Sequence, residues 1–440
     1  AIRYPLSAIR YPLSAIRYPL SAIRPVSVPT PYLAFRLWLK LGFISFGGPA
    51  GQIALMHREV VERRGWVTDR DFAHALNFCM VLPGPEALQL AIYLGWRLHG
   101  GWGGVVAGLC FILPSVAILL ALSFVYVSFG ELPRVAAALL GLKATVVALI
   151  LHAMLGLARR ALVRGLHRVL ALGAFLALTW LEAPFPLVLL VAALVGTIAI
   201  RDGVPAGPAA PVPSRWPWRT LLAGLLLWFL PLAVLLAAFG RDGLPTQVYG
   251  FFTQVALVTF GGAYAVLAYV QQHAVDSLGW LTAAQAVTGL GLAESTPGPL
   301  VIVLQFVGFM AGWNDPGGMT RQAMATLTAL AAAYATFLPS FIFILAGGPV
   351  VEATHGRLSF TAPLSAITAA VVGVILNLAM FFAYHVLWPQ GFGERFDAVS
   401  AAITVAAAIA LFRFKVGVIP LLGTCAIAGL GLGWLLPVLH

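Results

Sequence analysis

Charged residues are scarce in this sequence. Asp, Glu, Lys and Arg together make up 9% of its 440 residues, whereas 61% of the residues are hydrophobic. A soluble domain of that composition would lack the polar surface needed to cover its core. The scarcity therefore excludes an ordinary soluble enzyme or binding domain and predicts an all-α polytopic membrane protein.

Cysteines and clustered metal ligands are scarce as well. Cys79, Cys110 and Cys425 all lie in apolar runs, so they form neither a disulfide framework nor a metal-binding spacing. A membrane-embedded enzyme would need a nucleophile with its base, or metal ligands, at breaks in its helices. The sequence has no Ser/His/Asp set, paired Asp or His-x-x-His spacing at such breaks. We therefore expect no enzyme, no catalytic residue, no metal and no cofactor.

Acidic residues are the rarer of the two charged classes. The chain has 15 of them against 26 Lys and Arg, which gives a formal net charge of +11. The basic residues are scattered in short loops, where they orient a membrane protein rather than bind nucleic acid. We thus expect the lipid bilayer as a partner, and no nucleic acid. Trp66 and Trp280 are interpreted as anchors at the membrane interface.

Proline and glycine, by contrast, are abundant and interrupt the apolar runs. Pro83, Gly84 and Pro85 break the run from Phe72 to Trp96, because proline lacks a backbone N–H and glycine tolerates any φ. Within a bilayer such a break survives only where protein or a water-filled cavity covers the freed carbonyls. The half-helix that starts at Pro85 presents bare N–H groups and a partial positive charge. This break is therefore a candidate anion-binding site.

The same motifs occur twice in the same order. The members of the first three matched pairs are separated by one constant offset, and an insertion near residues 313–323 lengthens that offset for the last two pairs. The pairs are Phe46-Gly47-Gly48-Pro49 with Phe260-Gly261-Gly262-Ala263, Gly65-Trp66-Val67-Thr68 with Gly279-Trp280-Leu281-Thr282, Pro83-Gly84-Pro85 with Pro297-Gly298-Pro299, Leu113-Pro114-Ser115 with Leu338-Pro339-Ser340, and Val146-Val147 with Val371-Val372. The chain is predicted to contain two copies of one membrane unit, and paired broken segments point to a transport site.

These copies divide the chain into four parts. Residues 1–31 begin with a perfect heptapeptide repeat that has a proline every seventh residue, so we expect no helix there and set it aside as a repeat expansion or an artefact. Residues 32–200 form the first copy and residues 246–440 the second, each with six apolar segments. Between them, residues 201–245 comprise a linker and an unmatched apolar helix at about 219–239.

Arginines predict how the copies lie in the membrane. The loop from His57 to Asp71 contains four arginines, whereas the matched loop from Gln272 to Gly279 contains none. The copies are therefore expected to have inverted topologies, with the linker helix supplying the inversion. The loop from Arg159 to Arg168 also contains four arginines. Both basic loops face one side only if the Pro-Gly-Pro segment is re-entrant, and the Phe-Gly-Gly-Pro segment is a second re-entrant candidate.

These motifs resemble the long, two-domain members of the chromate ion transporter family, and the likeness covers nearly all of residues 32–437. The resemblance implies a multi-pass carrier in the cell inner membrane that exports chromate and confers chromate resistance, with sulfate as the related oxyanion. The sequence departs from the family pattern in three places: Ala263 stands at the position matched to Pro49, the second copy has an insertion, and the N-terminus carries a repeat. A carrier for sulfate or another oxyanion, and an oxyanion channel, remain alternatives. Oligomeric state is open, with a homodimer as one possibility.

The predicted substrate site consists of the two pairs of breaks. Opposed half-helix ends can hold a tetrahedral dianion without a dehydrated arginine, and glycine lets the backbone approach the oxygens closely. The alternative reading is close helix packing, since small residues are enriched at membrane helix contacts. The backbone positions proposed are Gly47, Gly48, Pro83, Gly84, Pro85, Gly261, Gly262, Pro297, Gly298 and Pro299.

Three intramembrane ionisable groups complete the set of candidates. Lys143, which aligns with Thr368, is a candidate counter-charge for the dianion. Its alternatives are a lysine that snorkels to the interface or pairs with Glu86. Glu86 and Glu294 are candidate carriers of a coupled proton, and otherwise carboxylates that offset helix dipoles.

Overall fold

The computed structural model describes residues 28–199, 217–260, 263–354, 361–393 and 395–435. Every element in these ranges is a helix, as the composition predicts. The helices of the first copy are α1 (Pro31–Ile44), α2 (Gly48–His57), the π-helical turn η3 (Arg58–Glu62), α3 (Asp69–Cys79), α4 (Glu86–Phe129), α5 (Pro133–Ala161), α6 (Gly165–Trp180) and α7 (Phe185–Ala199). Residues 1–27 of the N-terminal tail and residues 200–216 of the linker lie outside the described ranges.

The second copy follows the same order of elements. Even the π-helical turn recurs, because Arg58 and Gln272, which begin the two turns, are matched residues. Its helices are α9 (Leu244–Leu257), α10 (Ala263–Gln271), η4 (Gln272–Ser277), α11 (Ala283–Glu294), η5 (Leu300–Ile302), α12 (Val303–Asn314), α13 (Arg321–Thr354), α14 (Thr361–Leu387), α15 (Ala398–Phe412) and α16 (Val418–Leu435). The unmatched helix α8 (Trp218–Phe239) lies between the copies.

Several helices suit a bilayer. Among the described residues, five helices are long and apolar enough to cross it: α4, α5, α8, α13 and α14. The α4 helix is kinked at His99 and Gly100, whose backbone angles are not helical. Its first half therefore completes the segment broken at Pro83-Gly84-Pro85, and its second half is the part that spans the membrane. The protein is thus a multi-pass membrane protein.

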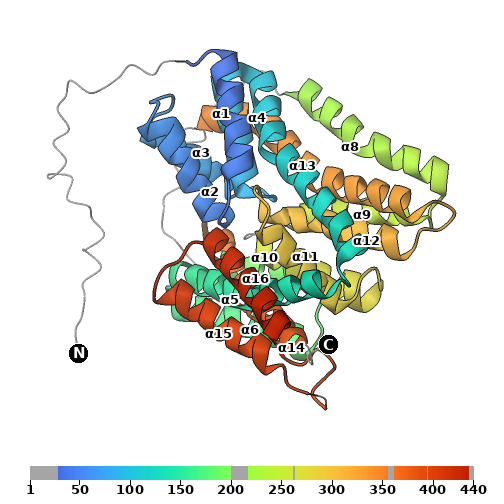
Figure 1. Cartoon of the computed structure of the whole chain (residues 1–440). Coiled ribbons are helices and arrows are strands. Elements are labelled where there is room, and N and C mark those ends of the chain that lie inside the picture. Colours follow the sequence, from blue (N-terminus) through green and yellow to red (C-terminus); the bar gives the residue numbers. More distant parts are fainter. Residues whose placement is uncertain (1–27, 200–216, 261–262, 355–360, 394, 436–440) are drawn as a thin grey trace, which may run out of the picture.

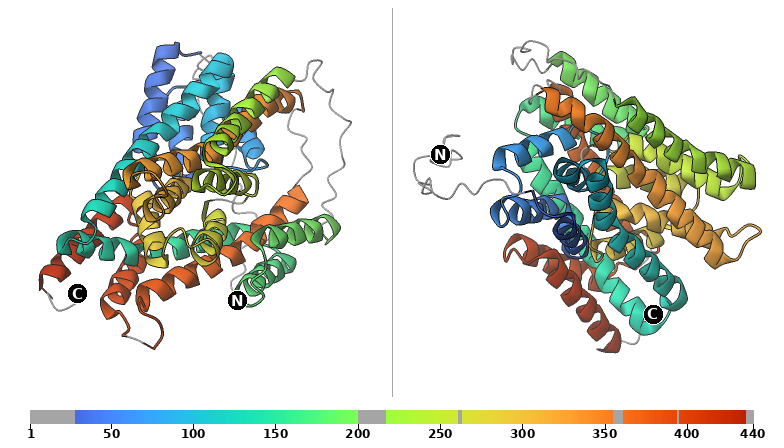
Figure 2. Two further views of the ribbon diagram at one scale, coloured as in Figure 1. Left: turned by 90° about the vertical axis from the view of Figure 1, so that its right-hand side faces the viewer. Right: turned by 90° about the horizontal axis from the view of Figure 1, so that it is seen from above.

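Helices of the two copies mix in two bundles (Figure 1). The first, which we call the hairpin bundle, contains α1, α4, α8, α9, α12 and α13 in the upper part of the figure. The second, the distal bundle, contains α5, α6, α7, α14, α15 and α16. Figure 2 separates the same groups in its left-hand view. Because α11 packs along α5 and α10 packs against α14, the second pair of broken segments joins the bundles.

Trp66 and Trp280 occupy matched positions inside the protein. Each is only 7% exposed. Each follows a glycine at φ 61°, and its backbone N–H donates to the preceding π-helical turn, at Val60 and Ala274 respectively. The interpretation of these tryptophans as interfacial anchors is therefore wrong. They are core residues that close the chain reversal after the first broken segment of each copy.

Candidate functional site

The broken segments of the first copy form hairpins whose ends meet on one side. Arg97, at the end of the first half of α4, donates to Asp71 at the start of α3 across 2.9 Å. His57, at the end of α2, lies 2.6 Å from Asp69. His99 lies 2.8 Å from the carbonyl oxygen of Pro29, just before α1. Each break therefore lies at the inner tip of a hairpin.

The α11–α12 segment of the second copy closes in the same way. Asn314, at the end of α12, donates to the carbonyl of Trp280 across 2.9 Å and to Gln285 across 3.2 Å, both at the start of α11. Gln285 and Asn314 share a cavity with Glu131, beyond the C-terminal end of α4. The first-copy hairpins instead meet near Arg97, in the first half of α4. The hairpins of the two copies thus open at opposite ends of α4.

At the tips, each copy bonds to the other through its backbone. The Gly84 N–H donates to the carbonyl oxygen of Thr259 across 2.8 Å, and the Gly298 N–H donates to that of Ser45 across 2.8 Å. Ser45 and Thr259 are matched residues, each directly before a Phe-Gly-Gly motif. The same hydrogen bond is thus made twice, from the Pro-Gly-Pro break of one copy to the Phe-Gly-Gly break of the other.

The glycines of the Pro-Gly-Pro breaks also pack reciprocally. Gly84 and Gly298 have φ of 127° and 101°, a region that favours glycine. A side chain at Gly84 would overlap the hydroxyl of Ser340, and one at Gly298 would overlap the hydroxyl of Ser115. Ser115 and Ser340 are matched residues. Close packing at these two glycines, which was the alternative reading, is therefore a real part of their role.

We call the region of the two hydrogen bonds between the copies the crossing of the breaks. Several other backbone groups there make no hydrogen bond to a described residue. A methyl group built on Gly47 or Gly48 would meet no described atom within 4 Å, and both glycines have positive φ, at 88° and 70°. Among the described residues, nothing accepts from the first N–H groups of α4, at 86–88, or from those at 300–301. Pro85 and Pro299 cap these two turns. Gly261 and Gly262 lie outside the described residues.

Buried polar side chains surround the crossing. Gln52 donates to the carbonyl oxygens of Ser45, across 3.2 Å, and Gly298, across 2.5 Å. Gln89 donates to the carbonyl oxygen of Pro83 across 2.7 Å. The buried hydroxyls of Ser45 and Ser340 have no hydrogen-bond partner among the described residues. Sequence reasoning missed these groups, although a glutamine one turn beyond a break in an apolar run is the signal that could have found them.

Lys143 lines a polar cavity rather than the crossing itself. It lies in the first half of α5, and no described carboxylate lies within ion-pair distance of it, so the alternative of a pair with Glu86 is wrong. The cavity has a volume of about 260 Å³ between α4, α5, α11 and α12. Its other polar lining residues are Tyr126, Glu131, Gln285, Trp313 and Asn314.

The two candidate carboxyl groups lie at opposite poles of their helices. Glu86 is in the first turn of α4 and is half-buried. Glu294 is the last residue of α11, is 7% exposed, and accepts a 2.5 Å hydrogen bond from the hydroxyl of Tyr264. Tyr264, on α10, was not predicted. Its matched residue in the first copy is Ala50, and that of Glu294 is Met80.

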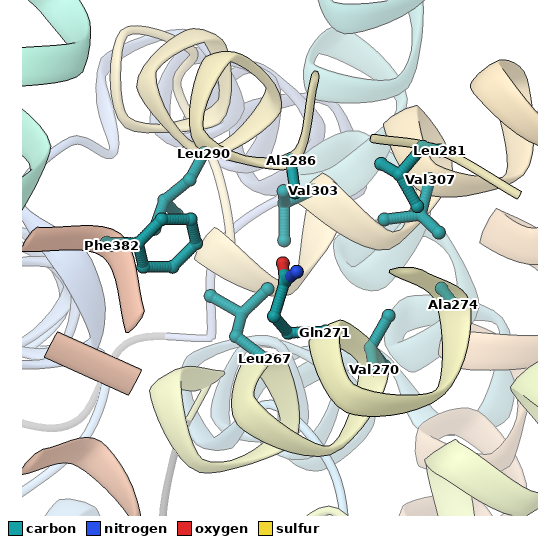
Figure 3. Close-up of a pocket in the computed structure, with 10 residues that line it drawn as sticks. All are labelled: Leu267, Val270, Gln271, Ala274, Leu281, Ala286, Leu290, Val303, Val307 and Phe382. Atoms are coloured by element: carbon teal, nitrogen blue, oxygen red, sulfur yellow. The ribbon is translucent and has the colours of Figure 1, made fainter. Parts of the chain in front are cut away.

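A second cavity lies beside the α11–α12 hairpin. Figure 3 shows Gln271 pointing into it among apolar side chains such as Leu267, Val303 and Phe382. Its volume of about 20 Å³ suits one water molecule and is too small for a tetrahedral oxyanion. The Gln271 side-chain nitrogen has no partner among the described residues. This small, mostly apolar cavity is therefore not the substrate site.

Comparison with known proteins identifies relatives across the whole transmembrane region. The profile of a family described as chromate transporter matches residues 33–197 and 246–430. A chromate transport protein of Pseudomonas aeruginosa is 30% identical over 92% of this chain and 92% of its own length. One of Cupriavidus metallidurans is 30% identical over 86% and 87%. An uncharacterised transporter of Methanocaldococcus jannaschii is 26% identical over 82% and 86%. No solved structure matches.

Proposed function

The chain belongs to the chromate transporter family, and from that premise we propose that it exports chromate across the cell inner membrane and so confers chromate resistance. The family is one of transporters, and the several apolar helices of this chain agree with that activity. Chromate is a tetrahedral dianion. The site must therefore bind two negative charges within the membrane without trapping them.

The reciprocal crossing of the breaks is the observation that carries this proposal. Two matched hydrogen bonds, from Gly84 to Thr259 and from Gly298 to Ser45, join the Pro-Gly-Pro break of each copy to the Phe-Gly-Gly break of the other. Such crossings of broken helices are where secondary transporters bind their substrates. Inverted topology of the copies is part of the proposal. Its support is the four-to-none difference in arginines and the opening of the hairpins at opposite ends of α4.

We assign the oxyanion to donors around this crossing. The free first-turn N–H groups at 86–88 and 300–301 each carry part of a helix-terminal positive charge. The hydroxyls of Ser45 and Ser340 are buried donors without a described partner. Gly47 and Gly48 leave open space beside the backbone. The N–H groups of Gly84 and Gly298 are already bonded across the copies, so their proposed role is to shape the site rather than donate to the substrate.

The Lys143 cavity is proposed as the vestibule on the exit side. It opens beyond the C-terminal end of α4, whereas the arginine-rich loop of residues 57–71 lies at the other end. By the positive-inside rule that loop is cytoplasmic, so the cavity faces away from the cytoplasm. The Lys143 ammonium has no described ion-pair partner and attracts a dianion into this polar cavity, while Glu131 in the same lining offsets part of that attraction.

Membrane potential alone can supply the driving force. A charge that leaves a cell negative inside gains ~2.3 kcal/mol per 100 mV, so a dianion gains roughly 4.6 kcal/mol. At about 1.4 kcal/mol per tenfold ratio, this corresponds to an outward gradient on the order of 2,000-fold. Export by uniport is therefore energetically sufficient, and proton exchange is an addition rather than a requirement.

Reconstituted vesicles test this function. The protein is placed in proteoliposomes with the potential clamped by potassium and valinomycin, negative on the cytoplasmic side, and with equal pH on both sides. We expect labelled chromate to leave the negative compartment, and labelled sulfate, of the same shape and charge, serves as the competing substrate. Transport of sulfate alone would overturn the assignment of chromate. Currents far above carrier turnover would indicate a channel instead.

A further inference from the structure

Glu294 and Glu86 experience opposite helix fields. Glu86 is in the first turn of α4, where the positive end of the helix dipole stabilises a carboxylate. Glu294 is the last residue of α11, where the negative end of the dipole disfavours one. The two carboxyl groups therefore differ in kind, although sequence reasoning treated them as equivalent candidates.

The surroundings of Glu294 favour its neutral form further. Its side chain is buried and no described cation pairs with it. The Tyr264 hydroxyl donates to its Oε1, which offsets only part of the cost of an ionised carboxylate there. An ionised carboxylate buried without a cation costs several kcal/mol. A neutral carboxylic acid beside a tyrosine hydroxyl avoids that cost.

The helices packed against α11 bring few other titratable groups. From α5 comes Lys143, and from α4 come Tyr126, beside Thr288, and Glu86 at its start. The described parts of η5 and α12 contain none. The titratable groups of α14 are Tyr384 and His385, near its far end and beside Asp276. Among the described residues of α11 and the helices packed against it, Glu294 is thus the one carboxyl group that is buried.

We propose that Glu294, held by Tyr264, is a proton-binding site, and that its proton crosses the membrane together with the oxyanion. This inference rests on the proposed function. A dianion at the crossing lies near Pro297, less than one helical turn of chain after Glu294, and its charge would repel a carboxylate there. Proton and dianion therefore bind cooperatively, and linkage makes the effect reciprocal. The carboxylate gains a proton on the side where the oxyanion loads and loses it where the oxyanion leaves.

The matched residues of the first copy set the stoichiometry. Ala50 and Met80 stand where the second copy has Tyr264 and Glu294, so the proton site exists once. One proton per dianion leaves one net negative charge moved in each cycle. Potential still drives export, but with half the electrical force of a bare dianion.

The dependence of the chromate gradient on potential tests this charge count. In mildly alkaline buffer, where chromate is a dianion, wild-type vesicles should reach an equilibrium gradient of roughly 50-fold per 100 mV. Glu294→Gln, which is permanently neutral, should carry the dianion alone and reach roughly 2,000-fold. Asp242→Asn, the same chemical change in an exposed loop, should behave as wild type.

Proton movement gives an independent readout. A pH-sensitive dye inside the vesicles should report one proton leaving with each chromate in the wild type and none in Glu294→Gln. Tyr264→Phe removes only the hydroxyl partner and should shift the pH dependence of transport while the coupling remains. A wild-type gradient of roughly 2,000-fold per 100 mV without proton movement would overturn the inference yet leave export standing. Absence of any chromate movement in the wild type would overturn the proposed function itself.

Discussion

At the scale of single residues, Gly84 and Gly298 allow the two copies to touch through their backbones. Each has a positive φ that favours glycine, and each faces a serine of the other copy. Packing and substrate binding are therefore not competing explanations for these glycines. A side chain there would push the copies apart at the place where the oxyanion is proposed to bind.

Gly298→Ala should damage this crossing, and Ser115→Gly should repair part of the damage. The added methyl group overlaps the Ser115 hydroxyl, and φ of 101° strains any residue but glycine. We expect a loss of about 2 kcal/mol in stability and a chromate transport rate lower by about tenfold or more. Removal of the serine side chain relieves the overlap but not the strain. Thermal unfolding in detergent and vesicle uptake measure the two effects.

Gly156→Ala is the matched control for this pair. Gly156 lies in α5 with no neighbouring atom within 4 Å of an added methyl group, so alanine should be neutral or slightly stabilising there. A Gly298→Ala variant as stable and active as Gly156→Ala would show that the crossing is looser than the structure indicates.

Lys143→Met should weaken recruitment of the oxyanion rather than its passage. The ammonium group lines the polar cavity without a described carboxylate partner, so its loss removes an attraction for the dianion. We expect KM for chromate to rise by about tenfold, or about 1.4 kcal/mol, with a smaller change in maximal rate. Lys143→Arg keeps the charge and should stay near wild type. Equal loss in both variants would point to packing instead.

At the scale of elements, an ion-pair cluster fastens the first hairpin. Glu59 in η3 is 1% exposed and accepts from Arg63 across 2.8 Å and from Arg64, while Lys40 of α1 lies 3.6 Å away. The buried carboxylate thus ties α1 to the turn that ends α2. Lys40 is thereby paired at the hairpin, which explains how the first broken segment tolerates it.

Stability should depend on pH through Glu59. Burial raises the pKa of this carboxyl group, but the hydrogen bond and charge of Arg64, with the charges of Lys40 and Arg63, outweigh burial and lower the pKa below 4.5. A group whose pKa is lowered in the folded state stabilises the fold above its unfolded pKa. That stability is lost as the pH falls through the folded pKa. Tm should therefore decline as the pH falls below 4.5, through the lower folded pKa of Glu59.

Glu59→Gln should remove this acid-side decline. At neutral pH we expect it to cost about 2 kcal/mol, because the hydrogen bonds to Arg63 and Arg64 lose their charge. Unfolding scans from neutral pH down to about pH 3 compare the variant with wild type. Parallel Tm curves for the two proteins would mean that another carboxyl group governs the acid response.

At the scale of the whole molecule, the two copies are matched in order but not in packing. Of the residues in α10, all but Tyr264 are buried, whereas in the matched helix α2 only Gln52 and Met56 are. The second-copy helices α10 and α11 also pack against α14 and α5 of the distal bundle (Figure 1). The matched helices α10 and α2 therefore differ in burial, with α10 enclosed on nearly all sides.

Inverted topology predicts that cysteines in matched loops label from opposite sides. Glu62 and Asp276 are exposed and lie just before the chain reversals at Trp66 and Trp280, so each can be replaced by cysteine. The three native cysteines are buried. In sealed, oriented vesicles an impermeant maleimide should label one of the two introduced cysteines from outside and the other only after the membrane is opened. Labelling of both from the same side would refute inversion and with it the proposed direction of the Lys143 vestibule.

Much of this protein's secondary structure and repeat organisation could be predicted from its sequence. Scarce charge predicted membrane helices, and missing N–H groups at Pro83, Pro85, Pro297 and Pro299 predicted the breaks, because both effects act within a few residues. The constant offset between the repeated motifs predicted two matched copies, and the structure has the same order of helices in each. The parity of the arginine-rich loops predicted that the segment at Pro83-Gly84-Pro85 turns back on itself, and the bond from Arg97 to Asp71 joins the two ends of such a hairpin. Its re-entrant course through the membrane stays a prediction.

Tertiary structure alone decided which distant groups meet. Gly84 bonds to Thr259, Glu294 bonds to Tyr264, and Lys143 lines the same cavity as Asn314, although no local pattern relates the partners. It also buried Trp66 and Trp280, which sequence reasoning assigned to the membrane interface. The physical reason is that backbone propensity depends on neighbours in the chain. Hydrogen bonds and ion pairs depend instead on how helices pack in three dimensions, and the packed helices can be far apart in the sequence, as the segments that contain Gly84 and Thr259 are.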